Sequence, residues 1–223
     1  MSGKLIVLEG TDGSGKATQA RMMGQRLQRE GIAFREIDFP RYGNPFAEPA
    51  RLYLEGVLGA HPGDVNAYAA TAFYAVDRYA SFQKVWRKEY EAGGLILSDR
   101  YTTSNAVHQG SKLAPPQRRA FFQWLEEFEC DRLGLPRPAL VIYLDVPTDL
   151  TEVMLRKRER DTHTRGDIHE QDLHYLRLCR ETGQEAAAYF HWHIISCDRE
   201  GALRPISEIH QDIYNLVQTC LKE

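Results

Sequence analysis

Residues 9–19 read EGTDGSGKATQ, and the spacing G-x-x-x-x-G-K from Gly10 to Lys16 is typical of a phosphate-binding loop. The apolar run 5–8 (LIVL) precedes this loop and a helical pattern over 18–30 follows it, which predicts a strand, a turn and a helix. Glycines in such a turn allow backbone N–H groups to point at phosphate oxygens, and the lysine neutralises charge on the outer phosphates. The stretch therefore predicts an α/β fold with a nucleoside triphosphate site.

One position departs from the usual loop, because Ala17 stands where Ser or Thr is expected. That hydroxyl normally ligates the Mg²⁺ ion that bridges the phosphates. Mg²⁺ retains most of its waters, so a carboxylate can hold it indirectly, and Asp99 at the end of the apolar run 95–98 is the candidate. The loop alone leaves three interpretations open: a working site with one part changed, a relic without activity, or a chance glycine-rich turn.

The composition fits one α/β domain over residues 1–223, since 43% of the 223 residues are hydrophobic. A net charge of −3 gives no basic field that would attract nucleic acid or a membrane surface, and no apolar run approaches the ~20 residues that span a bilayer. The four cysteines are scattered without a C-x-x-C pair. We therefore expect reduced thiols in a cytoplasmic protein, without disulfides or a zinc site.

Short apolar runs alternate with helical patterns along the chain. We predict strands at 5–8, 33–39, 95–98, 139–146 and 193–197, and helices at 18–30, 46–58, 65–91, 116–131, 148–160, 167–189 and 205–221. The alternation predicts a parallel sheet covered on both faces, whose ligands bind beyond the carboxyl ends of the strands. Polar clusters at 10–16, 39–42 and 99–110 fall at those ends.

Several segments together carry a more specific signal than the loop alone. They are LEGTDGSGKATQ (8–19), DFPRYG (38–43), FYAVDR (73–78), SDRYTTSNAVHQG (98–110) and an arginine-rich stretch after YLDVP (143–147). In this order and spacing, the chain resembles the thymidylate kinase family from residue 8 to about 200. The resemblance implies the fold of P-loop nucleoside monophosphate kinases, with a five-stranded parallel sheet in the order 2-3-1-4-5, flanking helices and a lid at about 156–170.

The resemblance also implies the reaction. The enzyme would transfer the γ-phosphoryl group of ATP to dTMP, giving dTDP and ADP for dTTP synthesis, with Mg²⁺ as cofactor and a homodimer as the assembly. By the match of loop positions, the expected ATP-binding residues are Gly10, Thr11, Asp12, Gly13, Ser14, Gly15, Lys16, Ala17 and Thr18.

For the acceptor nucleotide, the family motifs match residue by residue. Asp12 is expected to contact the 3′-hydroxyl of the deoxyribose, and Arg41 and Arg100 the acceptor's phosphate. Tyr74 is expected to stack on thymine beside Arg78, since four residues of spacing put both on one helix face; the family usually has Phe at the first position.

The remaining acceptor residues come from two motifs. Ser104 and Asn105 match the family's polar residues below the base, and Gln109 matches the same motif. Phe39 belongs to the same expected site. His108 stands where the family commonly has Tyr, near the 2′ carbon of the sugar. The chain therefore departs from the family at a position that bears on the preference for deoxyribose over ribose.

The family places a catalytic arginine in the phosphate loop or in the lid. Loop positions 11–14 hold no arginine, so the lid stretch 156–165 (RKRERDTHTR) is expected to supply it, with Gly166 as a hinge. Arg160 and Arg165 are the favoured residues, and a solvated helix face is the alternative for any one of them. The expected catalytic set is Lys16, Asp99, Arg100, Arg160 and Arg165.

Two other functions are compatible with a phosphate-binding loop. A related kinase could act on another deoxynucleotide or on a nucleoside, but two arginines, Arg41 and Arg100, favour an acceptor that already carries phosphate. A non-catalytic nucleotide-binding module would explain Ala17 as decay, yet Lys16 and Asp99 are intact.

Three further features are expected to have structural or positioning roles. We expect His191-Trp192-His193 to pack or face solvent, since no third metal ligand is in view. The helix over 65–91 is expected to form core or a subunit contact, and Glu9 to orient either the loop or the acceptor nucleotide.

Overall fold

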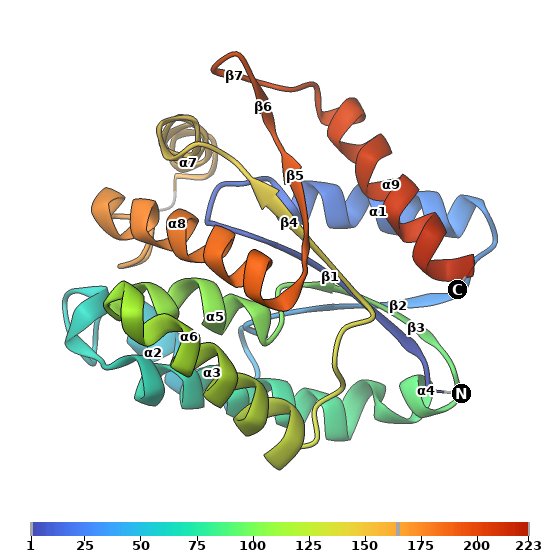
Figure 1. Cartoon of the computed structure of the whole chain (residues 1–223), viewed down its shortest axis with the longest axis horizontal. Helices are drawn as coiled ribbons and strands as arrows, with labels where there is room; N and C mark the ends of the chain where they lie inside the picture. The colour runs from blue at the N-terminus through green and yellow to red at the C-terminus, as the bar shows by residue number, and fades with distance from the viewer. Residues whose placement is uncertain (1, 164–165, 223) are drawn as a thin grey trace.

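A parallel five-stranded sheet forms the centre of the computed structural model, which describes residues 2–163 and 166–222 (Figure 1). The strands are β1 (Lys4–Gly10), β2 (Phe34–Asp38), β3 (Leu95–Asp99), β4 (Leu140–Asp145) and β5 (His193–Ser196). They lie in the order β2-β3-β1-β4-β5, and every neighbouring pair is parallel. The predicted sheet and its order 2-3-1-4-5 are confirmed.

Helices cover both faces of the sheet, with α1 and α9 on one face and α3, α5, α6 and α8 on the other (Figure 1). The α-helices are α1 (Lys16–Arg29), α2 (Glu48–Leu54), α3 (Ala67–Ser81), α4 (Arg87–Glu91), α5 (Thr103–His108), α6 (Pro115–Glu126), α7 (Thr148–Thr162), α8 (Leu173–Phe190) and α9 (Ile206–Lys222). Short 3₁₀ turns (Pro45–Ala47, Pro62–Asp64, Gly110–Lys112), π turns (Phe82–Trp86, Glu127–Arg132) and a hairpin of β6 (Asp198–Arg199) and β7 (Ala202–Leu203) complete the described elements.

The apolar strands explain why both faces are covered. Successive side chains of a strand point to opposite faces, and β1 is apolar at each position from Leu5 to Leu8. Ile6 and Leu8 pack in one buried cluster with Met23 of α1, whereas Leu5 packs in another with Trp86. Sheet and helices therefore share two cores, one on each side.

Four predicted helices differ from the structure, among them the one over 116–131, which is α-helical only to Glu126 and continues as the π turn Glu127–Arg132. The pattern over 46–58 yields a helix only to Leu54, and the pattern over 65–91 is interrupted by the π turn Phe82–Trp86. The helix predicted from 167 begins at Leu173, because Asp167 Oδ1 accepts from the backbone N–H groups of His169 and Glu170 and holds the preceding segment in a turn. The helix α5, within the polar cluster 99–110, was not predicted.

Among the helices of the described ranges, none combines the length and apolarity needed to cross a bilayer.

Candidate active site

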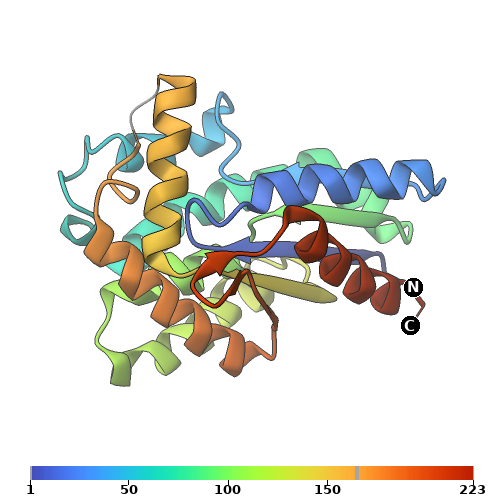
Figure 2. The same cartoon turned by 90° about the horizontal axis from the view of Figure 1, so that it is seen from above.

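The loop between β1 and α1 has the shape that its glycines predict. Gly13 and Gly15 have φ of 77° and 86°, in the left-handed region that favours glycine. A Cβ on Gly13 would lie 2.9 Å from side-chain carbons of Thr151 and Leu155, so the loop packs tightly against α7. Figure 2 shows α7 standing beside this turn. Space as well as torsion thus requires glycine at position 13.

Lys16 is buried inside the loop at the first turn of α1. Its Nζ donates to the carbonyl oxygens of Gly10 at 2.9 Å and Thr11 at 2.7 Å. Burial lowers the pKa of Lys16 to about 8, so the amine is still mostly protonated at neutral pH. Its contacts here are uncharged, which leaves the positive charge available to a phosphate.

A cleft of about 410 Å³ opens beside the loop, a volume within the usual range of small-molecule sites. Its walls come from the loop and α1, the end of β3, and α7. The lining residues are Asp12, Gly13, Gly15, Lys16, Ala17, Thr18, Asp99, Arg100, Met154, Leu155 and Arg158. We name it the donor cleft.

The donor cleft contains a buried polar atom that suits a hydrated cation. Asp99 Oδ1 is buried and has no hydrogen-bond partner among the described residues, and it lies in the same cleft as Ala17 and Lys16. A carboxylate oxygen is the kind of group that accepts hydrogen bonds from magnesium-bound waters. The residues present therefore fit Mg²⁺ held through water, even without a hydroxyl at position 17.

A second cleft, the acceptor pocket, shares Asp12 and Arg100 with the first. Its lining residues are Asp12, Phe39, Pro40, Tyr42, Leu54, Tyr74, Arg78, Arg100, Tyr101, Ser104, Asn105, His108, Gln109, Asp167 and His169. Every predicted substrate-binding residue except Arg41 is among them. Arg41 lies at the side, where its backbone N–H donates to Asp77 and its Nη1 to Ser81 Oγ at 3.4 Å.

Arg100 lies at the junction of the two clefts. Its backbone has φ of 66°, unusual for a residue with a side chain, and its N–H donates to the Leu8 carbonyl at 3.0 Å. The guanidinium pairs with Asp12 and donates from Nη1 to His108 Nε2 at 3.1 Å. Although burial raises it, the pKa of Asp12 lies below its usual range because of the charge on Arg100.

At the inner end of the acceptor pocket, Arg78 is held by a residue that the sequence did not single out. Its Nε and Nη2 donate to the two carboxylate oxygens of Glu129 at 2.7 and 2.6 Å, and both side chains are buried. Asn105 Nδ2 donates to the same carboxylate at 2.9 Å. Glu129 lies in the π turn Glu127–Arg132, where no motif marks it.

Asp167 and His169, which follow α7, also enter the acceptor pocket; the sequence did not single them out because its pattern assigned them to a helix. His169 Nε2 lies 2.8 Å from the Tyr53 hydroxyl, and the His169 ring stacks on His108 with centroids 5.5 Å apart. Burial, followed by the charge on Asp12, raises the pKa of Asp167 to about 7.

Asp12, His108 and His169 also offer metal-ligand atoms within 4.8 Å of one another. However, His108 Nε2 accepts from Arg100 and Asp12 pairs with Arg100, so this cluster surrounds an arginine cation. These contacts do not favour a metal at that point.

Glu9 connects the loop to α5. Its carboxylate accepts from the Gly10 N–H at 2.9 Å, from Thr103 Oγ1 at 2.6 Å and from Ser104 Oγ at 2.7 Å. Glu9 is fully buried and lines neither cleft. Of the two interpretations of Glu9, these contacts favour orientation of the loop.

The helix α7, which overlaps the expected lid, brings Arg158 to the donor cleft, where it forms an ion pair with Glu170. Arg160 is exposed and does not line either cleft. Arg165 lies outside the described residues. The described part of the expected lid therefore offers a different arginine from the two that the sequence favoured.

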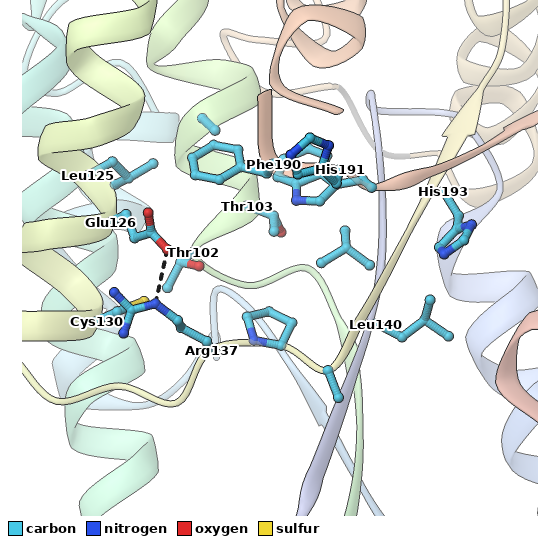
Figure 3. A pocket seen from close by; sticks show the side chains of 15 residues that line it. Thr102, Thr103, Leu125, Glu126, Cys130, Arg137, Leu140, Phe190, His191 and His193 are labelled. Atoms are coloured by element: carbon cyan, nitrogen blue, oxygen red, sulfur yellow. Dashed lines mark hydrogen bonds and ion pairs between the residues drawn. The ribbon is translucent and has the colours of Figure 1, made fainter. Parts of the chain in front are cut away.

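A further cavity of about 220 Å³ lies away from the loop, between α6, the start of β4 and the end of α8 (Figure 3). Its wall includes the ion pair of Glu126 with Arg137, and His191 and His193 on different sides. Among the described residues, the one group of three or more metal-ligand side chains is Asp12, His108 and His169, so neither His191 nor His193 belongs to such a group. None of the predicted site residues lines this cavity.

Comparisons with known proteins point the same way as the motifs. The sequence model of the thymidylate kinase family matches residues 8–213. A thymidylate kinase of Mycobacterium tuberculosis is 30% identical over 189 residues, which cover 82% of this chain and 86% of the relative. A probable thymidylate kinase of Pyrococcus abyssi is 30% identical over 98% of this chain and 97% of its own, and a thymidylate kinase of Halothermothrix orenii is 28% identical over 99% of both.

Proposed function

The chain belongs to the thymidylate kinase family, and on that premise we propose which of its residues carry out the transfer of a phosphoryl group from ATP to dTMP. The activity is that of a dTMP kinase, which converts ATP and dTMP to ADP and dTDP. One observation carries the assignment of residues: the donor cleft and the acceptor pocket share Asp12 and Arg100. Phosphates bound in the two clefts would meet at that shared wall, as in-line transfer requires.

In the donor cleft, the loop 10–15 and Lys16 would bind the outer phosphates of ATP, with the N-terminal dipole of α1 adding positive potential. We propose that Asp99 orders waters of a bound Mg²⁺ ion, which would neutralise phosphate charge. Support comes from the unpartnered Asp99 Oδ1 and the absence of a hydroxyl at Ala17. Thr18 lines the same cleft and is available to the nucleotide.

In the acceptor pocket, Arg100 would bind the phosphate of dTMP and Asp12 its 3′-hydroxyl. Tyr74 would stack on the thymine, and Asn105 would read its hydrogen-bonding edge. Phe39, Ser104, His108 and Gln109 also line the pocket. Stacking tolerates any base, so selectivity depends on the polar groups and the pocket shape.

The role that we propose for Arg78 differs from direct binding of the base alone. Two of its nitrogens are already committed to Glu129, and a third, Nη1, donates to the Tyr101 carbonyl at 3.3 Å. Arg78 would therefore shape the base end of the pocket together with Glu129, and contact the base with the edge that these bonds leave.

The acceptor pocket has to open for dTMP. Its volume is about 60 Å³, well below the ~300 Å³ at which nucleotide-sized sites begin. Asp167 and His169 form one wall, so movement of the segment after α7 would enlarge it. We propose that residues 156–170 act as a lid on the chain's kinase domain, with Arg158, which lines the donor cleft, as the favoured catalytic arginine of the lid and Arg160 and Arg165 as further candidates.

The assembly and location are also proposals. Exposed apolar side chains on α3, namely Tyr68, Val76 and Tyr79, suit a homodimer contact. No disulfide joins cysteines in the described residues, which suits a reducing compartment such as the cytoplasm. Sedimentation of the wild type and of Val76→Asp tests the dimer, because a charge in that contact should leave monomers.

The assignment of the acceptor pocket is tested by a coupled ADP-release assay with dTMP, dUMP, dAMP and dGMP. We expect kcat/KM to be highest for dTMP, and Asn105→Ala to narrow the gap between dTMP and the purine nucleotides. Equal use of dAMP or dGMP by the wild type would contradict the proposed roles of Tyr74 and Asn105.

A further inference from the structure

The side chain of Arg100 has partners of different charge. Two are carboxylates, Asp12 and, at 3.8 Å, Glu9; two are uncharged, His108 and, with its Oγ 3.4 Å from Nη1, Ser104. Arg100 Nη2 pairs with the carboxylate of Asp12, and Arg100 Nη1 lies 3.1 Å from His108 Nε2. Arginine only donates, so His108 Nε2 accepts through its lone pair. The contact therefore requires a neutral imidazole whose proton is on Nδ1.

The surroundings of His108 select that tautomer. Its Nδ1 lies 3.5 Å from Cys179 Sγ on α8, and Cys179 Sγ lies 3.4 Å from Ser111 Oγ. Ser111 Oγ donates to the His108 carbonyl oxygen at 2.8 Å, which uses the only proton of that hydroxyl. The thiol must then donate to Ser111, and its sulfur accepts from Nδ1–H of His108. These three residues close a ring that keeps the Nε2 lone pair toward Arg100.

The charge states agree with this ring. Burial, opposed by the charge on Asp12 and assisted by the charge on Arg100, lowers the pKa of His108 to about 3. Burial also raises the pKa of the Cys179 thiol to about 12. Both side chains are thus uncharged at neutral pH, and the tautomer is set by their hydrogen bonds.

The charged and the uncharged partners of Arg100 act differently on its positive charge. The carboxylate of Asp12 compensates the guanidinium charge and competes with an incoming phosphate, whereas a neutral imidazole fixes direction and leaves the charge in place. We propose that His108, held by Cys179 and Ser111, is a positioning residue that orients Arg100 for the phosphate of dTMP. This rests on the proposed function, which gives that phosphate to Arg100.

The test uses dissociation constants for dTMP and ATP, measured by calorimetry, together with kcat and KM for dTMP. His108→Leu removes the acceptor, while His108→Gln keeps an amide oxygen close to the position of Nε2. Both are also made in the Arg100→Ala background. Cys179→Ala opens the ring, and Cys130→Ala, another buried cysteine that is not part of the ring, is its matched control.

We expect His108→Leu to weaken dTMP binding and raise its KM about tenfold, the size of one lost hydrogen bond, with ATP binding within about twofold of the wild type. His108→Gln should recover most of the loss. Cys179→Ala should weaken dTMP binding a few-fold while Cys130→Ala does not. In the Arg100→Ala background, His108→Leu should add nothing, because its effect acts through the guanidinium.

Three results would overturn the proposal: equal losses for His108→Leu and His108→Gln, an undiminished loss in the Arg100→Ala background, or normal dTMP binding by His108→Leu. The first two would indicate a packing role. If Arg100→Ala itself binds dTMP normally, the proposed function of Arg100 fails first, and the inference fails with it. Should His108→Leu not fold, the comparison of Cys179→Ala with Cys130→Ala decides, and equal affinities for dTMP would refute the ring.

Discussion

Replacing Glu129 by Ala should destabilise the protein far more than loss of a typical ion pair. Glu129 is 0% exposed and Arg78 1%, and two hydrogen bonds of 2.7 and 2.6 Å join them. Glu129→Ala would leave a guanidinium buried without its counter-charge and Asn105 without one of its acceptors. Removing one member of a buried pair costs about 3–5 kcal/mol, and for a chain of this size each kcal/mol lowers the Tm by about 2–4 °C. We therefore expect the Tm to fall by about 6–20 °C.

The assay is thermal unfolding followed by circular dichroism, with Glu127→Ala as the control. Glu127 lies two residues away in the same π turn and pairs with Arg132 in solvent, so its removal should not shift the Tm measurably. A double replacement, Glu129→Met with Arg78→Met, should recover most of the stability, because the buried charges leave together. A Tm for Glu129→Ala close to that of Glu127→Ala would refute the argument that the pair is buried and desolvated.

Three further outcomes are expected. Ala17→Thr should lower the Mg²⁺ concentration at half-maximal rate with little change of the maximal rate, while Asp99→Asn should raise that concentration and lower the maximal rate. A magnesium titration of the ADP-release rate checks this, and activity found only in Ala17→Thr would contradict an active wild-type site. The pKa of Asp167 is raised from 3.8 to about 7, so its protonated form stabilises the fold at low pH, and this contribution is lost as the pH rises through about 7. Asp167→Asn should therefore have a higher Tm than the wild type at pH 8 but not at pH 4, and an equal difference in Tm at both pH values would contradict this. Arg158→Ala should lower kcat, measured at saturating substrate, by about 10³-fold, whereas Arg156→Ala, at an arginine that pairs with Glu152, should change kcat little. A larger loss of kcat in Arg156→Ala than in Arg158→Ala would contradict the proposed role of Arg158.

The parts of the fold that the sequence predicted have local causes or follow from the family resemblance. The strand of residues 5–8, the glycine turn and the helix after Lys16 follow from short-range pattern, and the sheet order followed from the family resemblance. The segment 167–172 misled because its composition suits a helix, while the Asp167 side chain satisfies backbone N–H groups in a turn instead. Local propensity does not record that competition.

The acceptor pocket shows the same limit for side chains. Its motif residues were found because they lie in conspicuous segments, and nearly all of them line one cleft. Glu129 and Cys179 were not found, since each acts on a motif residue from a distant helix through a contact that has no characteristic spacing. What the sequence leaves out is the set of residues that hold the motif side chains in place.

The shared wall of the two clefts has a consequence for inhibition. A compound that contacts both Asp12 and Arg100 touches donor and acceptor sites at once. A substitution that escaped such a compound at either residue would also alter the use of a natural substrate, so resistance there would carry a loss of fitness. Compounds anchored only at residues of the acceptor pocket outside the proposed substrate contacts, Tyr42 or Leu54 for example, meet no such restriction, and escape variants should arise at those positions first.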